Sequence, residues 1–355
     1  MLHSKYFIFA LFVFFICFIH IILFFVWKVL KTKILDIYFR KIFVFIVPIG
    51  LLISVLLVGD SILAKKEYGI TMENQIKQQF AAINERKYDT IILGNSRLYR
   101  GINPELLDSD CYNFAFDNDS FLEGYYKLKY LETIGKLPER VILGVDYFEF
   151  SFVSAGMQST YDVFFDKEYD DILANCSSLS FGGEKRNIDT QINKRLNILF
   201  ISNYYNAISY LYNRYIKKDK RVSYVSELGQ YCIYPQPKAK IGDFLTRSSE
   251  IMNEQKNAYE RIILFCKENN IKIIQLMLPL RDIELNCYTQ ESKENMDNIF
   301  NSNDFAKYLN YASKPGFFIS DFMDDTHLNL NGADKFTKLL NADLIKLSFY
   351  EDFKK

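Results

Sequence analysis

Two long apolar runs near the N-terminus constrain this chain more than any other feature. The first extends from Tyr6 to Trp27, and the second extends from Ile42 to Val58. A run of about 20 apolar residues is long enough to cross a bilayer as a helix, and the second run is near the lower length limit. We therefore expect residues 1–65 to form a membrane anchor of two transmembrane helices, at about 6–27 and 42–63.

A basic segment separates the two apolar runs. Its charged residues are Lys28, Lys31, Lys33, Asp36, Arg40 and Lys41. Short basic loops tend to stay in the cytoplasm, so the chain after residue 65 is expected outside it, in the periplasm or the extracellular space. Lys65 and Lys66, just beyond the second run, oppose this orientation. A cleaved signal peptide is not expected, because the first run is too long and no small-residue cleavage pattern follows it.

The sequence after the anchor changes character twice. Residues 66–88 are polar and helix-compatible, with apolar residues at helical spacing, and they are expected to form a stalk or packing helix. From Asp89 onward, short apolar segments alternate with helical ones. The expected strands are Thr90–Leu93, Cys111–Phe116, Arg140–Val145, Ile271–Leu278 and Phe317–Phe322, and the expected helices are Phe121–Ile134, Ile251–Asn269 and Gly332–Leu347.

This alternation predicts one α/β domain over residues 89–349. Strands that alternate with helices of this length favour right-handed crossovers and a parallel sheet with helices on both faces. We expect a flavodoxin-like fold, in which a tyrosine- and asparagine-rich stretch at about 150–245 is an insertion above the sheet.

Only three histidines occur in the chain, and His327 alone lies outside the N-terminal apolar region. Imidazole is the side chain whose unperturbed pKa suits proton transfer near neutral pH, and Asp324, three residues earlier, is placed to orient the ring. Ser96 follows the strand expected at 90–93, in the turn Gly94-Asn95-Ser96. A serine at such a strand-to-helix turn lies at the carboxyl edge of a parallel sheet, beside backbone N–H groups that stabilise an oxyanion. Its alternative role is to cap the helix that follows.

Two sequence blocks carry a family resemblance. Ile91-Ile92-Leu93-Gly94-Asn95-Ser96-Arg97 and Asp324-Asp325-Thr326-His327-Leu328-Asn329, in this order, resemble the SGNH/GDSL hydrolase superfamily. Within it, the chain looks most like membrane-anchored relatives that act with acyl-transfer systems on cell-surface polymers. The resemblance implies that Ser96 attacks an ester carbonyl, that His327 takes its proton and that Asp324 holds the imidazole tautomer.

The chain departs from this superfamily at the oxyanion hole. Members typically have a glycine in a second block and an asparagine in a Gly-x-Asn third block as hydrogen-bond donors. Here the second-block region, residues 113–118, lacks glycine, and the third block reads Gly144-Val145-Asp146. An ionised Asp146 can only accept hydrogen bonds. Asn118 is the candidate replacement donor. Arg97 is a candidate for binding an anionic substrate group, or is equally a solvated helix residue.

Two functions follow as expectations. The first is an extracytoplasmic serine O-acyl esterase or O-acyltransferase acting on an envelope polysaccharide or teichoic-type polymer, with a multi-pass membrane acyltransferase as a possible partner. The alternative is a non-catalytic, membrane-tethered assembly or binding factor. Lysine plus arginine equals aspartate plus glutamate, at 43 each, so no charge excess indicates nucleic acid. Without a phosphate-binding glycine-rich loop or metal-ligand spacing of cysteine and histidine, we expect neither cofactor nor metal.

Overall fold

The computed structural model describes residues 72–151, 224–235 and 250–351, together with the single residues Ile37, Phe164 and Tyr212. Within these ranges no helix is both long enough and apolar enough to cross a membrane. The anchor helices predicted at about 6–27 and 42–63 lie outside the described residues.

A five-stranded parallel sheet forms the centre of the fold. Its strands are β1 (Thr90–Leu93), β2 (Cys111–Asn113), β3 (Arg140–Gly144), β6 (Lys272–Met277) and β7 (Ala306–Asn310). They lie in the order β2-β1-β3-β6-β7, and every neighbouring pair is parallel. Counted along the chain, this is the 2-1-3-4-5 order of flavodoxin-like sheets. The predicted parallel α/β architecture is confirmed.

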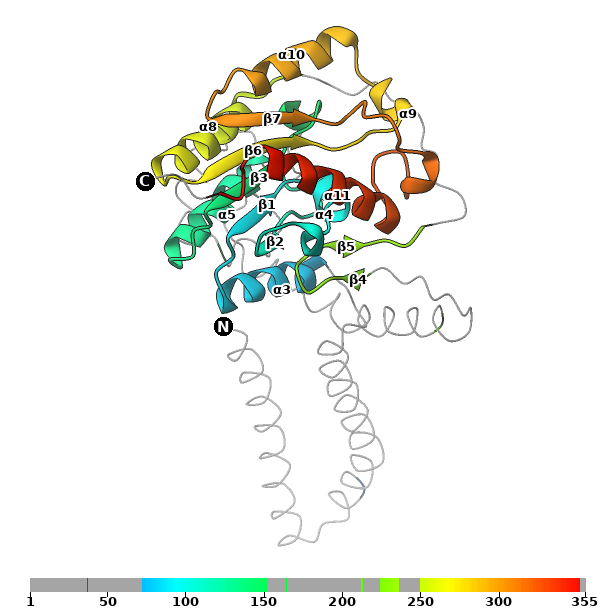
Figure 1. The fold of residues 1–355 in the computed structure, drawn as a ribbon. Helices are drawn as coiled ribbons and strands as arrows, with labels where there is room; N and C mark the ends of the chain where they lie inside the picture. The colour runs from blue at the N-terminus through cyan, green and yellow to red at the C-terminus, as the bar shows by residue number, and fades with distance from the viewer. Residues whose placement is uncertain are drawn as a thin grey trace, which may run out of the picture. The chain divides into compact units, whose positions relative to one another are not determined.

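Helices pack on both faces of this sheet. The helices of the described ranges are α3 (Met72–Glu85), α4 (Ser96–Gly101), α5 (Phe121–Thr133), α8 (Asn253–Glu268), α9 (Asp282–Leu285), α10 (Gln290–Asn301) and α11 (Leu330–Lys346), with short 3-10 turns η1 (Pro104–Leu106), η2 (Glu149–Ser151) and η6 (Ile319–Asp321). Helix α5 packs against α8, while α4 packs against α11. Figure 1 shows α11 on one side of the sheet, with α5 and α8 on the other.

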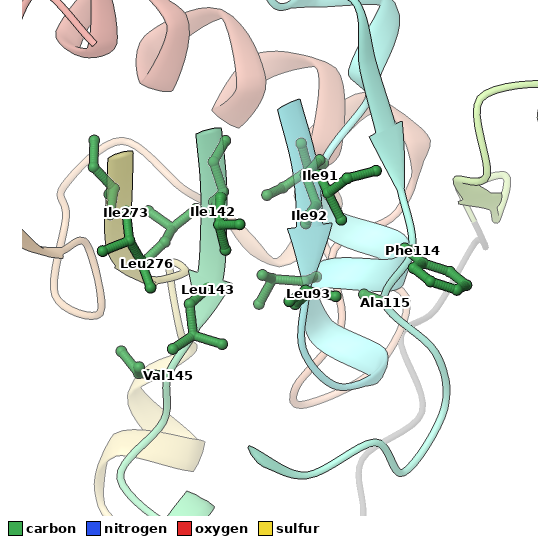
Figure 2. Packing of buried hydrophobic residues seen from close by; sticks show 14 of the residues in the cluster. Ile91, Ile92, Leu93, Phe114, Ala115, Ile142, Leu143, Val145, Ile273 and Leu276 are labelled. Carbon is green, nitrogen blue, oxygen red and sulfur yellow. The ribbon is translucent and has the colours of Figure 1, made fainter. Parts of the chain in front are cut away.

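The central strands are apolar on both faces, as a covered parallel sheet requires. All residues of β1 and β3 are buried. Figure 2 shows Ile91, Ile92 and Leu93 of β1 among the buried apolar side chains of the neighbouring strands. At Gly144 in β3, an added Cβ would lie 2.4 Å from a methyl carbon of Leu98. The glycine therefore lets α4 approach the sheet closely.

One predicted strand is wrong. Phe317–Phe322 contains the 3-10 turn η6, and Phe318 and Ile319 are 67% and 63% exposed. The fifth strand is β7, Ala306–Asn310, at the edge of the sheet, where only its first residue is buried. An edge strand with so few buried side chains lacks the apolar run by which the other strands are predicted. In Phe317–Phe322, by contrast, only the last two residues are buried.

Part of the expected insertion docks on the sheet as a hairpin. Its antiparallel strands are β4 (Tyr224–Val225) and β5 (Tyr231–Cys232). The Gln230 side chain donates to the Arg100 carbonyl at 3.0 Å, and the Ile233 carbonyl accepts from the Leu330 N–H at 2.7 Å. The hairpin therefore contacts both α4 and the start of α11. Outside residues 224–235, the structure describes only residues 150–151, Phe164 and Tyr212 of the expected insertion at about 150–245.

Candidate active site

Ser96 is the first residue of α4, directly beyond the carboxyl end of β1. The helix is capped by Asn95, whose Oδ1 accepts the Arg97 N–H at 2.9 Å. Ser96 is therefore not the helix cap, and its side chain is half-buried and available for another partner.

That partner is His327. Ser96 Oγ lies 2.8 Å from His327 Nε2, although the two residues are 231 positions apart in the sequence. The other ring nitrogen, Nδ1, lies 2.9 Å and 3.1 Å from the two carboxylate oxygens of Asp324. An ionised carboxylate only accepts, so Nδ1 carries the proton and Nε2 accepts from the Ser96 hydroxyl. The convergence expected from the sequence is present at these three side chains.

The Asp324 carboxylate is fixed by its own loop. Its Oδ1 accepts the backbone N–H groups of Thr326 at 2.9 Å and His327 at 2.8 Å, and the Thr326 hydroxyl at 3.2 Å. Burial raises the pKa of Asp324, but the hydrogen bond and charge of His327 and these two backbone N–H groups outweigh it, so the pKa falls below its usual range. Asp324 is therefore ionised at neutral pH.

Further contacts hold the loop that carries His327. Phe322 and Leu328 form an antiparallel bridge across it, and the Met323 N–H donates to the His327 carbonyl at 2.8 Å. Asn329, which is buried, caps α11 and donates to the Ser320 carbonyl at 2.7 Å. On the other side, Arg281 donates to Asp325 at 2.6 Å. Asp325 thus pairs with Arg281, and Asp324 is the residue that contacts the imidazole.

The Arg97 side chain lies in a buried ion-pair cluster. It pairs with Asp146, at the end of β3, and with Glu284 of α9 at 2.5 Å, and all three side chains are less than 5% exposed. Burial lowers the pKa of Arg97, but the negative charges of Asp146 and Glu284, together with the hydrogen bond to Glu284, more than offset this, and the pKa is raised. These two ion pairs join α4 to the end of β3 and to α9. They give no support to the predicted contact of Arg97 with an anionic substrate group.

Asn118 lies in the loop that follows β2. It is exposed and adopts a left-handed backbone conformation, with a φ of 62°. This loop is close to Ser96, because one guanidinium nitrogen of Arg100 donates both to the Ser96 carbonyl and to Asp117. The donor role of Asn118 stays a prediction.

Asp146 occupies the position at which a donating asparagine was expected from the resemblance. One of its oxygens accepts from Arg97, and the other accepts the Tyr147 N–H at 2.8 Å. It is therefore an acceptor on both sides. The Ser96 N–H, at the first position of α4, has no acceptor within the helix and is a donor that remains for an oxyanion.

Several residues of this site were not predicted from the sequence, among them Thr326, Asn95 and Glu149. Thr326 and Asn95 lie inside the two motif blocks, beside the residues predicted to react, so their proximity was the available signal. Glu149 accepts from the Asn95 side-chain amide at 2.8 Å, although it lies 54 positions away. No local pattern indicates such a contact.

Comparisons with known proteins leave the site to be interpreted from its own geometry. No family model matches the chain, and no curated protein does. Among solved structures, one described as "The structure of a putative platelet activating factor from Streptococcus pneumonia" aligns with 11% identity and a TM-score of 0.36. The alignment covers 84% of this chain and 98% of that one. At this score the likeness carries no argument about chemistry.

Proposed function

We propose that this protein is a serine esterase or acyltransferase that forms an acyl-enzyme on Ser96. The observation that carries the proposal is the 2.8 Å contact of Ser96 Oγ with His327 Nε2, with Asp324 on the opposite ring nitrogen. Ser96 attacks an ester carbonyl while His327 takes its hydroxyl proton, and His327 then returns this proton to the leaving alkoxide. The ionised Asp324 stabilises the imidazolium between these steps.

The second half of the reaction decides between hydrolysis and transfer. Water or a sugar hydroxyl gives a proton to His327 and attacks the Ser96 ester. His327 passes this proton to the departing Ser96 oxygen, so the serine hydroxyl is restored and either a free acid or an acylated sugar is released. Both outcomes use the same three side chains. In the transfer version, a multi-pass membrane acyltransferase is the class of partner that supplies the acyl group.

The proposed substrate class follows from the predicted location. The two apolar runs and the basic segment between them favour a domain held at the outer side of the membrane. The esters within reach there belong to envelope polysaccharides or teichoic-type polymers. The resemblance of the two motif blocks to membrane-anchored SGNH relatives supports the same substrate class.

Hydrolysis of an aryl acetate by the full-length protein in detergent tests the chemistry. Ser96→Ala and His327→Ala are each expected to lower the rate by about 10³-fold or more, because the removal of one member of such a triad disables the unit. Ser120→Ala is the matched control, since Ser120 is also a serine at a helix start, but it is buried and bonds Glu123. Equal rates for Ser96→Ala and Ser120→Ala would contradict the proposal.

A non-catalytic assembly factor is the second candidate. One observation favours it: Asp146 is ion-paired where an oxyanion donor was expected, and the loss of one such donor costs about 10²-fold or more in rate. Complementation separates the two candidates. Ser96→Ala, expressed at the wild-type level, should fail to restore a deletion strain if the protein is an enzyme, and full restoration would favour the assembly factor.

A further inference from the structure

Asn95, the residue before Ser96, is held by two partners whose hydrogen-bond directions are fixed. The Arg97 backbone N–H can only donate, so the atom that it contacts at 2.9 Å is the Asn95 carbonyl oxygen. The Asn95 amide nitrogen therefore faces Glu149, and Glu149 Oε2 accepts from it at 2.8 Å. Asn95 is 5% exposed and Glu149 is 1% exposed, so water does not replace either contact.

Glu149 reaches this position from a different part of the sheet. It begins the turn η2, just beyond β3, whereas Asn95 follows β1. Their contact ties the start of α4 to the neighbouring strand, and the ion pair of Arg97 with Asp146 ties the next residue of α4 to the same segment. Ser96 lies between these two attachments.

The surroundings of Glu149 favour an uncharged carboxyl group. Burial is the largest effect on its pKa and raises it, and the negative charge of Asp146 acts in the same direction. The charge of Glu123 also raises this pKa, whereas the Asn95 hydrogen bond and the charge of Arg97 lower it. The net result is a pKa of Glu149 well above its usual value. An uncharged carboxyl still accepts a hydrogen bond through its carbonyl oxygen.

We propose that Glu149 is a positioning residue for Ser96, which acts by accepting the Asn95 amide and so fixing where α4 begins. This inference rests on the proposed acyl-transfer function and adds a residue to it. A misplacement of a reacting group by about 1 Å can cost about 10²-fold in rate. The loss of the Glu149 acceptor removes one of the two contacts that hold the Asn95 side chain, and Ser96 is the next residue.

The rate at which a fluorophosphonate labels Ser96 in the full-length protein measures this positioning directly. Glu149→Leu is expected to label at least about tenfold more slowly than wild type, and Asn95→Ser is expected to behave alike, because serine still caps a helix but cannot reach Glu149. Glu149→Gln keeps an accepting oxygen and should stay within about threefold of wild type. The double variant Asn95→Ser/Glu149→Leu should be no slower than either single variant, since both remove the same contact.

Glu123→Leu is the matched control. Glu123 is equally buried at 2% exposed, but its carboxylate bonds Ser120, at the start of α5. It is expected to lose stability and to keep the wild-type labelling rate, when every variant is measured below its unfolding temperature.

The outcomes separate the inference from the function on which it rests. A wild-type protein that is folded but unlabelled overturns both. Wild-type labelling that Glu149→Leu leaves unchanged, or that Glu149→Gln slows as much as Glu149→Leu does, overturns the positioning role alone. If Glu149→Leu does not fold, Asn95→Ser decides: a rate within about threefold of wild type overturns the inference, and a loss of about tenfold or more supports it.

Discussion

Asp324→Asn changes one atom of the proposed triad and leaves its loop nearly intact. The asparagine oxygen can still accept the backbone N–H groups of Thr326 and His327, which Asp324 accepts at 2.9 and 2.8 Å. Its NH₂ group then faces His327 Nδ1, where Asp324 now accepts. Two donors cannot share this contact, so the imidazole moves its proton to Nε2. That nitrogen can no longer accept from the Ser96 hydroxyl.

The expected loss is about 10³- to 10⁴-fold in kcat, the scale seen when a triad imidazole is held in the wrong tautomer. At about 1.36 kcal/mol for each factor of ten, this corresponds to about 4–5.5 kcal/mol of transition-state stabilisation. The assay is hydrolysis of an aryl acetate by the full-length protein in detergent, with the unfolding midpoint measured in parallel. KM should change much less than kcat, because the substrate does not bind through Asp324.

Asp325→Asn is the matched control for this experiment. Asp325 pairs with Arg281 at 2.6 Å, whereas Asp324 is the carboxylate that lies on His327 Nδ1. Its replacement should lower kcat by less than about tenfold, since an ion pair at the edge of the site is worth about 1 kcal/mol. A variant Asp324→Asn that keeps kcat within tenfold of wild type, or that loses no more than Asp325→Asn, would refute the tautomer argument.

Two further predictions concern stability. Burial raises the pKa of Glu123 from 4.5 to about 7, so its protonated form stabilises the fold below pH 4.5 and this contribution is lost as the pH rises toward 7. In urea titrations, the free energy of unfolding of Glu123→Gln should therefore rise relative to that of wild type as the pH goes from 4.5 to about 7. A difference between the two proteins that stays constant over this pH interval would contradict the prediction. Gly332→Ala should cost about 1–3 kcal/mol, because its Cβ would meet the Asp321 carbonyl oxygen at 2.0 Å. Gly124→Ala, with its nearest neighbour at 3.5 Å, should instead stabilise α5 by up to about 1 kcal/mol, and equal effects of the two alanines on urea unfolding would contradict this packing.

The sequence predicts the parts of the fold that local patterns specify. The strand β1 matches its predicted bounds, and the strand β3 differs by a single residue, because each is a compact apolar run beside a turn. The edge strand β7 and the helix α10 were not predicted, because few of their residues are buried and so no apolar pattern marks them. β7 has one buried residue, and α10 buries only Ser292, Met296 and Phe300. Their places depend on packing against the rest of the sheet.

The candidate site shows the same division. Ser96, Asp324 and His327 could be predicted because a single histidine remained outside the apolar N-terminal region and the topology brings strand ends to one edge. The burial of Arg97 against Asp146 and Glu284 could not, because its partners lie 49 and 187 positions away. The contact between Asn95 and Glu149 could not be predicted either, because the two residues are 54 positions apart.

Peptide mapping after fluorophosphonate labelling tests the central proposal most directly. The full-length protein in detergent should carry the label on Ser96, and Ser96→Ala should carry none. His327→Ala, confirmed as folded by its unfolding transition, should also stay unlabelled, because the Ser96 hydroxyl then has no base at 2.8 Å. A folded wild-type protein without label, or with the label on another serine, would contradict the account.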